Sequence, residues 1–353
     1  MSRHGPDRLF RAGADVELTP QSTRNPRAES GPLLSVRDLV KHYPARGTQR
    51  QQGSVVHAVD GVSFEIDENE TLGLVGETGC GKSTVARLAT RLLEPTSGTI
   101  TYAGTDITRW SSRRLKPVRR DIQIVFQDPY SSLNPRRRVG SIIGDPLRVH
   151  GIGTTSERRA RVTEVLRLVG LDPTCADRYP HQFSGGQRQR IGVARAIITS
   201  PRLIVADEPV SALDVSIQAQ VLNLVDELRH TFGLALLFIS HDVSVIRHVS
   251  DRVAVMYLGK IVEVGETERI FAAPSHPYTA ALLAAVPKAR TTGTPRARVP
   301  VIGEPPSPLS PPSGCRFRTR CPFARQVCID VEPPLERREG ALVACHFPLP
   351  LSN

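Results

Sequence analysis

The stretch GETGCGKST, residues 76–84, directly follows the apolar run LGLV and precedes a segment with apolar residues at helical spacing. It fits the spacing G-x-x-x-x-G-K-[ST] of a phosphate-binding loop set between a strand and a helix. Glycines let the backbone curl so that its N–H groups point at phosphate oxygens, and the following helix directs its positive end at the same anion. Lys82 adds a charge toward the terminal phosphates, and Ser83 offers an oxygen to Mg²⁺. The loop predicts a nucleoside triphosphate ligand, and does not by itself separate a kinase, a GTPase, a helicase and a transporter motor.

The composition is that of a soluble, globular chain with a basic surplus. Its 353 residues are 39% hydrophobic and 23% charged, with a formal net charge of +11. This length suggests one large domain or two of ordinary size. The positive charge favours acidic partners such as nucleic acid, a nucleotide or an anionic membrane surface. Arginines spread over a solvated surface explain the surplus equally well, because no run of about five or six basic residues stands out.

No segment approaches the roughly 18 apolar residues that a membrane-spanning helix needs. The N-terminal stretch MSRHGPDRLFRAGADVELTP lacks the apolar centre of a signal peptide. We therefore expect a cytoplasmic protein that reaches a membrane only through a partner.

Patterns along the chain predict three regions. Residues 1–32 are polar, with scattered Pro, Gly, Ser and Arg, and predict a disordered arm. Over residues 33–270, apolar runs alternate with segments of helical periodicity, which predicts an α/β core with a largely parallel sheet. Residues 271–353 begin with proline-dense stretches and contain four of the six cysteines, so we expect a small appended domain there.

Several turn residues predict local boundaries within the core. Asp60-Gly61 predicts a turn, and Asn69 stands where a left-handed residue is wanted before the next strand. The helix after the phosphate loop is expected to continue until Pro95 ends it, and a later helix is expected to end at Gly233.

Two acidic residues end the apolar strand LIVADE at 203–208. Such a strand delivers Asp207 and Glu208 next to the phosphate site. Because successive side chains of a strand point in opposite directions, the two should have different roles. Asp207 suits the second shell of Mg²⁺, and Glu208 suits a general base that polarises the attacking water. Gln127 and His241 also follow apolar strands, where a histidine can orient water or touch the terminal phosphate, but each alone is uninformative.

A second anion-binding helix end is predicted in FSGGQRQRIGVARAII, residues 183–198. Ser184 is a good N-cap, and Gly185 and Gly186 leave backbone N–H groups uncovered. One chain with one phosphate loop therefore has two phosphate-receptive helix ends. Either they serve two ligands, or a neighbouring chain completes one site.

With these motifs in order, the chain resembles the ATP-binding subunits of ABC transporters over roughly residues 33–346. The resemblance implies a P-loop NTPase fold, with a RecA-like mixed sheet core and a helical signature subdomain. FSGGQ departs from the commoner motif by having Phe183 in place of Leu. The nucleotide-binding residues that the resemblance implies are Tyr43, which stacks on adenine, the loop residues Gly76, Glu77, Thr78, Gly79, Cys80, Gly81, Lys82, Ser83 and Thr84, the signature residues Ser184, Gly185, Gly186 and Gln187, and Asp214 in the dimer-facing loop SALD. The implied Mg²⁺ residues are Ser83, Gln127 and Asp207, and the implied catalytic residues are Glu208, His241 and Gln127.

The resemblance also implies a mechanism. Two such subunits meet head to tail, so that ATP on one phosphate loop is covered by the signature helix of the other, and hydrolysis lets the dimer open. The opening passes to transmembrane partners through residues 127–135. The implied partners are a second ABC ATPase subunit, by family pattern a paralogue, two permease subunits and an extracytoplasmic peptide-binding protein. The implied location is the cytoplasmic face of the cell membrane.

Several stretches are similar to the oligopeptide and dipeptide importer branch of this family. They include VFQDPYSSLNPR, DEPVSALDVSIQAQV, HPYTAALL and the tail GEPPSPLSPPSGCRFRTRCPFARQVC. Nickel-importer and phosphonate-pathway ATPases are neighbours in this group and commonly lack so full a tail. The resemblance therefore implies peptide import.

The tail cysteines have the spacing Cys315-x5-Cys321-x6-Cys328-x16-Cys345. Four soft ligands can hold zinc or an iron–sulfur cluster, and the spacing lacks the two C-x2-C knuckles of a zinc ribbon. Some members of the peptide branch carry an iron–sulfur cluster on matching cysteines, so the resemblance implies a 4Fe-4S cluster. Zinc and four reduced, buried thiols remain as alternatives.

A soluble ATP-dependent clamp on nucleic acid is the alternative from another class. Clamps of the DNA-repair type need a long coiled coil between phosphate loop and signature, and this interval of about a hundred residues has no sustained heptads. Translation-factor types need two cassettes, and the chain has one. No nucleic-acid partner is therefore expected; salt-sensitive binding to DNA or RNA is the observation that favours the clamp.

Overall fold

Two β-sheets form the framework of the part of the chain that the computed structural model describes, which is residues 31–45, 55–128, 130, 132–285 and 300–350. The predicted arm, residues 1–32, therefore lies outside the described residues except for its last two. The smaller sheet is antiparallel, with the strand order β2-β1-β4-β5. Its strands are β1 (Leu34–Pro44), β2 (Val55–Ile66), β4 (Ser97–Tyr102) and β5 (Thr105–Asp106).

The larger sheet carries the strands that end at the predicted site. Among the described residues its order is β11-β12-β10-β9-β3-β8-β7-β6. The run from β9 to β6 is parallel, and β10, β11 and β12 add antiparallel strands at the other edge. The strands are β3 (Thr71–Val75), β6 (Ile122–Val125), β7 (Leu203–Asp207), β8 (Ala235–Ser240), β9 (Arg252–Tyr257), β10 (Lys260–Glu266), β11 (Glu336–Arg338) and β12 (Ala341–Val343). Every residue of β3, β7 and β8 is buried, as expected for parallel strands covered on both faces.

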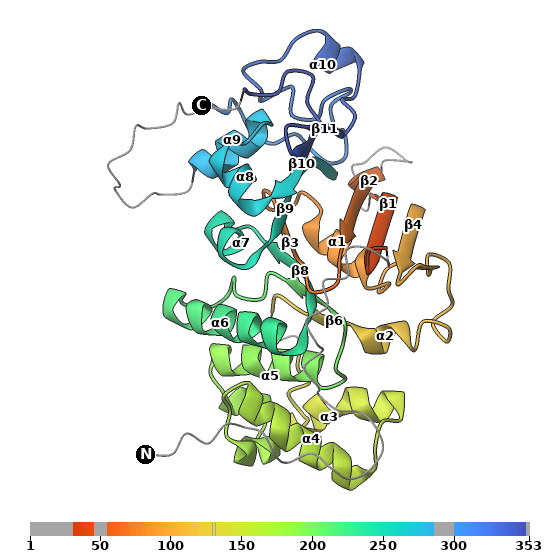
Figure 1. Ribbon diagram of the computed structural model, residues 1–353, viewed down its shortest axis with the longest axis vertical. Coiled ribbons are helices and arrows are strands. Elements are labelled where there is room, and N and C mark those ends of the chain that lie inside the picture. Colours follow the sequence, from red (N-terminus) through yellow and green to blue (C-terminus); the bar gives the residue numbers. More distant parts are fainter. Residues whose placement is uncertain (1–30, 46–54, 129, 131, 286–299, 351–353) are drawn as a thin grey trace.

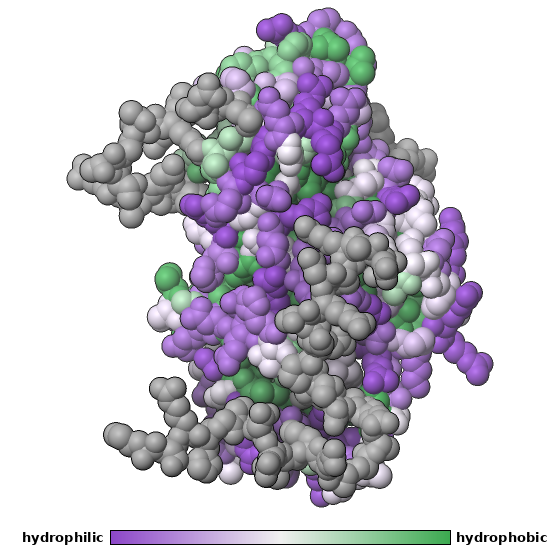
Figure 2. Space-filling view, in the orientation of Figure 1, coloured by the Kyte–Doolittle hydropathy of each residue, from purple (hydrophilic) through white to green (hydrophobic). Residues whose placement is uncertain are grey.

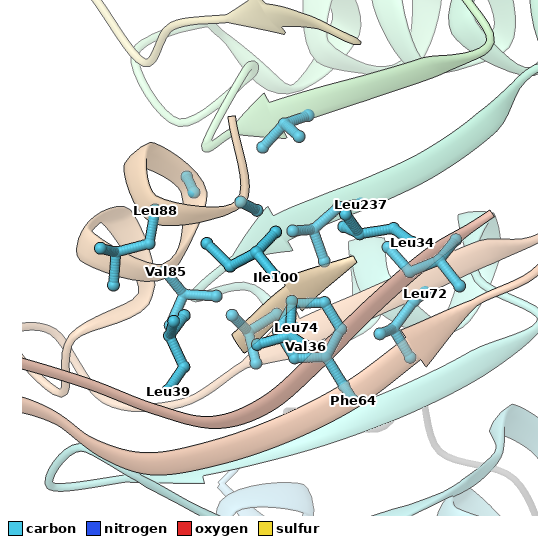
Figure 3. Close-up of a cluster of buried hydrophobic side chains, with 14 of the residues drawn as sticks. Leu34, Val36, Leu39, Phe64, Leu72, Leu74, Val85, Leu88, Ile100 and Leu237 are labelled. Carbon is cyan, nitrogen blue, oxygen red and sulfur yellow. The ribbon is translucent and has the colours of Figure 1, made fainter. Parts of the chain in front are cut away.

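The first helix after the phosphate loop packs into the core between the two sheets. Helix α1 (Lys82–Ala89) buries Val85 and Leu88, which meet Leu74 of β3 and Val36 and Ile100 of the smaller sheet in one hydrophobic cluster (Figure 3). This packing fixes the start of α1, and so fixes the phosphate loop against the end of β3.

A helical subdomain extends from the far edge of the larger sheet (Figure 1). Its helices pack in a hydrophobic cluster with Val165, Leu166, Phe183 and Ile191, which continues onto Ile204 of β7 in the larger sheet. The helices here are α3 (Val139–His150), α4 (Thr155–Leu168), η1 (Pro173–Asp177), η2 (Pro180–Gln182) and α5 (Gly185–Ile197). The short helix α2 (Val118–Asp121) precedes β6 and buries Val118 in the core between the two sheets. The predicted α/β fold with a mixed sheet and a helical signature subdomain is confirmed.

The remaining helices cover the sheet or belong to the C-terminal region. They are α6 (Val215–Phe232), α7 (Val243–Val249), α8 (Thr267–Ala272), α9 (Pro277–Ala284) and α10 (Val327–Asp330). The C-terminal strand β12 pairs with β10, so that Val264 lies opposite Leu342. The C-terminal region therefore continues the sheet of the core. The division at residues 270 and 271 stays a prediction.

Two local predictions are wrong and two are confirmed. Asp60-Gly61 is no turn, because β2 runs through it as one strand with a shift of register against β1. Helix α1 ends at Ala89, well before Pro95. It ends there because the Thr90 hydroxyl donates to the carbonyl oxygen of residue 86 and residue 91 has a left-handed backbone conformation. Asn69 is left-handed with φ +61°, and α6 ends at Gly233 with φ +61°.

No helix in the described part of the chain combines the length and the hydropathy of a membrane span. The face seen in Figure 2 is mainly hydrophilic, with hydrophobic residues in small areas.

Candidate functional site

The phosphate loop connects β3 to α1 and is crowded at two of its three glycines, Gly76 and Gly81. Gly79 and Gly81 have φ of +81° and +110°, which residues with a side chain rarely adopt. A Cβ on Gly81 would lie 2.0 Å from the carbonyl oxygen of Ala58, and a Cβ on Gly76 would lie 2.1 Å from that of Met256. Because the obstructing atoms belong to the backbone, the curl of the loop requires glycine at these positions.

Lys82 and Ser83 bring a cation and a hydroxyl to the end of the loop. Lys82 is 4% exposed, and its Nζ donates to the carbonyl oxygens of Gly76 at 2.8 Å and Glu77 at 3.0 Å. Ser83 Oγ donates to Asp207 Oδ1 at 2.9 Å. A buried ammonium thus stands near a hydroxyl and a carboxylate, a set of groups that is chemically suited to phosphate and Mg²⁺.

The two acidic residues at the end of β7, Asp207 and Glu208, have different surroundings. Asp207 is 4% exposed, and burial raises the pKa of its carboxyl against the hydrogen bond from Ser83, which lowers it. Glu208 has φ +48°, in the left-handed region that few residues with a side chain occupy. Its N–H donates to the carbonyl oxygen of Ile239 on β8 at 2.9 Å. Strained backbone of this kind concentrates at functional sites.

Three side chains from three strand ends meet at Glu208. Gln127, after β6, donates from Nε2 to Glu208 Oε2 at 3.0 Å. His241, after β8, places Nδ1 3.0 Å from the same oxygen. Because β6, β7 and β8 are parallel neighbours, their carboxyl ends meet at one edge of the sheet. The fold therefore brings Gln127 and His241, each uninformative alone in the sequence, to the carboxylate of Glu208.

The signature segment caps α5 as predicted. Ser184 Oγ accepts the N–H of Gln187 at 3.3 Å, and Gln187 Oε1 accepts the N–H of Ser184 at 3.1 Å. This reciprocal pair is a capping box. A Cβ on Gly186 would lie 2.3 Å from Ile217 Cγ2 of α6, so glycine lets the two helices approach. Helices α5 and α1 lie in different parts of the molecule (Figure 1).

Two further predicted residues lie at the margins of the site. Tyr43 stands near the end of β1, opposite Val56 of β2, with Lys41 Nζ 5.4 Å from its ring centroid. Ala58, two residues after Val56 on β2, borders the phosphate loop at Gly81. Asp214 is the N-cap residue of α6 and makes no side-chain cap bond there.

The remaining predicted nucleotide-binding residues include a buried cysteine, Cys80. Burial raises the pKa of the Cys80 thiol, and nearby Lys82 lowers it. A buried thiol with a raised pKa is a compact packing group more than a reactive one. Thr78 is exposed, Thr84 donates its N–H to the carbonyl oxygen of residue 81 at 3.0 Å, and Gly185 is the first residue of α5.

The four tail cysteines gather in one region. Cys315 donates its N–H to the carbonyl oxygen of Cys328 at 2.8 Å. Burial raises the pKa of the Cys315 thiol to about 11 and that of Cys345 to about 12, and both thiols interact electrostatically with Cys321. In the described residues, no three of the four sulfur atoms lie within 4.8 Å of one another.

Two side chains near the phosphate loop are missed by the sequence reasoning. Tyr278 and Arg320 both contact Glu77, from 201 and 243 residues away in the chain. No spacing rule joins residues so far apart, although the HPYT and CRFRTRC stretches that contain them stand out in the tail.

Comparisons with known proteins agree with this arrangement. Residues 59–211 match the family model described as ABC transporter. Oligopeptide transport ATP-binding protein AppF of Bacillus subtilis is 54% identical over 89% of this chain and 97% of its own length. The chain belongs to the ATP-binding proteins of ABC transporters. As a member of that family, it is an ATPase.

Further relatives and solved structures extend the comparison. Probable peptide ABC transporter ATP-binding protein y4tS of Sinorhizobium fredii is 51% identical over 91% of each chain. The dimeric ATP-binding cassette MJ0796, bound to ADP and Pi, superposes with a TM-score of 0.60 at 28% identity, over 66% of this chain and 98% of that one. Residues 262–328 match the model described as Oligopeptide/dipeptide transporter, C-terminal region. The ABC cassette therefore carries a second recognisable region at its C-terminal end.

Proposed function

We propose that this chain is the ATP-hydrolysing subunit of an ABC importer that carries peptides across the cytoplasmic membrane. The observation that carries the proposal is a complete phosphate-loop cassette joined in one chain to a region matching the oligopeptide/dipeptide transporter model. The relatives at 54% and 51% identity carry oligopeptide transport and peptide transport in their names.

In this proposal Glu208 is the general base for the attacking water. The hydrogen bonds that its Oε2 forms with Gln127 and His241 support the assignment, because they hold the carboxylate in one orientation. Ser83, Gln127 and Asp207 are the side chains that hold Mg²⁺. The ion, when bound, neutralises charge on the phosphates.

The nucleotide contacts divide between two subunits. Lys82 and the loop N–H groups bind the phosphates, and Tyr43 stacks on adenine. The signature residues 184–187 and Asp214 serve the nucleotide of a second ABC ATPase subunit, which we take to be a paralogue. The neighbouring Val215 is 83% exposed, which supports a partner on this face because a large apolar side chain there is otherwise left in water.

A groove on the helical subdomain suits the permease subunits. It encloses about 390 Å³, and Ser132, Asn134, Arg137, Ile142 and Asp145 are among its lining residues. Ser132 and Asn134 belong to the segment that begins at Gln127, so an occupant of the groove can act on the catalytic site. We propose that a cytoplasmic segment of each permease docks here, which places the chain on the cytoplasmic face of the membrane, with a peptide-binding protein on the other side.

Reconstitution of the transporter tests the function. The chain, its partner ATPase and both permeases are reconstituted in liposomes, and the peptide-binding protein is added. Release of phosphate from ATP is then measured. We expect oligopeptides or dipeptides to stimulate ATP hydrolysis and to accumulate inside. Stimulation by nickel or by a phosphonate, with no response to peptides, would contradict peptide import, and stimulation by DNA or RNA would favour the nucleic-acid clamp.

We also propose that Cys315, Cys321, Cys328 and Cys345 hold a structural 4Fe-4S cluster. The electrostatic interactions among the four thiols support four thiolate ligands at one centre. Cysteine thiols lose their protons when they bind a metal cluster. Their raised pKa values favour the protonated form of the free thiols.

Metal analysis of anaerobically purified protein is the test of the cluster. The wild-type chain is expected to contain iron and acid-labile sulfide in equal amounts. Cys321→Ser should lose most of both, whereas the buried Cys175→Ser, which lies outside the tail, should retain them. Stoichiometric zinc, or protein free of metal, would contradict the proposal.

A further inference from the structure

Glu77, the second residue of the phosphate loop, is fixed by the C-terminal region through two of its groups. Arg320 donates from one guanidinium nitrogen to both carboxylate oxygens, each at 2.9 Å. The N–H of Glu77 donates to Tyr278 Oη at 3.0 Å. Its carbonyl oxygen accepts from Lys82 Nζ at 3.0 Å. The loop residue that contacts the C-terminal region is therefore bonded directly to the phosphate-binding lysine.

The contact rests on a rigid aromatic support. Tyr278 is 1% exposed, and its ring lies 4.6 Å from Tyr257 and 5.4 Å from Phe317, measured between centroids. Its N–H donates to Nδ1 of His276 at 3.0 Å. The N–H of His276 in turn donates to the fully buried Glu263 of β10 at 2.9 Å. Packing and hydrogen bonds together therefore hold the Tyr278 hydroxyl at the loop.

The segment between the first two tail cysteines is anchored to the cassette by both of its buried arginines. Arg316, directly after Cys315, donates to the carbonyl oxygen of Leu258 at 2.6 Å and pairs with Asp60. The second of these arginines directly precedes Cys321 and is the one that reaches the phosphate loop. Order in the cysteine region and the position of the loop thus depend on the same short segment.

The charge of Glu77 gives this contact a consequence for ATP. A carboxylate in the phosphate loop repels a polyanionic ligand. The Arg320 guanidinium, 10% exposed at its side chain, neutralises that carboxylate from the side of the C-terminal region. We propose that Arg320 is a positioning residue for the phosphate loop, through which the cysteine-bearing region raises the affinity of this chain for ATP. The inference rests on the proposed nucleotide site.

A double-mutant cycle on the full-length chain tests the inference. Fluorescence titration gives the Kd for Mg·ATP, and phosphate release gives KM and kcat. Arg320→Met is expected to raise both Kd and KM by about tenfold, with kcat little changed. Glu77→Gln should lower Kd by about threefold, because the repelling charge is gone while an oxygen still accepts from Arg320. The double variant should return close to the wild-type Kd.

Matched variants separate this effect from a loss of folding. Arg318→Met lies in the same segment, where its side chain bonds to Ser313, and it should keep the wild-type Kd. Thermal unfolding shows whether Arg320→Met is less stable than the wild type. If it is, Arg320→Lys, which keeps the charge, is the variant to compare, and it should recover part of the lost affinity. A double variant as weak as Arg320→Met would overturn the electrostatic role. Absence of ATP binding by the wild type would instead refute the proposed function.

Hydrogen exchange reports the reverse direction of the coupling. If the cysteine region raises ATP affinity, ATP must equally stabilise that region. Amide exchange in residues 315–321 is therefore expected to slow when ATP binds the wild type, and to be unaffected by ATP in Arg320→Met. Equal slowing in the two proteins, or none in the wild type, would overturn the coupling.

Discussion

Glu208→Gln is expected to bind ATP with close to wild-type affinity while hydrolysing it at least about a hundredfold more slowly. Glutamine keeps the size of the side chain and still accepts a hydrogen bond from Gln127, but its amide cannot take a proton from water. Phosphate release measures the rate. Size-exclusion chromatography with light scattering, in the presence of the partner ATPase subunit, measures the ATP-bound dimer, which should accumulate in this variant.

The control for this variant is Glu227→Gln on the exposed face of α6, which should hydrolyse ATP at the wild-type rate. If Glu208→Gln also turned over at that rate, Glu208 would not be the base. If the variant lost ATP binding instead, the carboxylate would serve mainly to hold the site together, since it accepts bonds from two neighbouring strand ends.

Lys82→Ala is expected to weaken ATP binding by about ten- to a hundredfold. The substitution removes the ammonium that neutralises the terminal phosphates, and it also leaves the carbonyl oxygens of Gly76 and Glu77 without their donor. Fluorescence titration with a labelled ATP analogue measures the affinity, and thermal unfolding shows how much of the effect comes from a loosened loop.

Lys116→Ala, at an exposed position in the same chain, is the control and should bind ATP as the wild type does. Wild-type affinity in Lys82→Ala would mean that the loop N–H groups and α1 alone hold the phosphates. Loss of affinity together with global unfolding would leave the lysine with a structural role, which circular dichroism would reveal.

The sequence alone points to the phosphate loop and to the acidic strand end because both lie beside strong local signals. The phosphate loop combines an apolar strand, glycines at fixed spacing and a helix, and all of these depend on neighbours within a few residues. Asp207 and Glu208 end a strand whose apolar run is unmistakable. The wrong prediction of a turn at Asp60-Gly61 also comes from a local signal, because a glycine with φ +80° suits a bulge inside β2 as readily as a turn.

Contacts between distant parts of the chain lay beyond such reasoning. The meeting of Gln127, Glu208 and His241 depends on the order of β6, β7 and β8 in the sheet. The role of Glu77 depends on a region more than two hundred residues away. Neither follows from spacing along the chain, because loops of any length can bring two strand ends together.

The sequence alone determined the phosphate loop, the capped signature helix and the acidic strand end, since local backbone geometry and short-range periodicity specify these features. The family followed from the resemblance that these motifs carry together. Only the tertiary structure decided which polar side chains share one carboxylate, and that the C-terminal region adds strands to the core sheet and an arginine to the phosphate loop. The physical reason is that pairing of strands and burial of side chains are chosen by the packing of the whole core, which no single stretch of sequence contains.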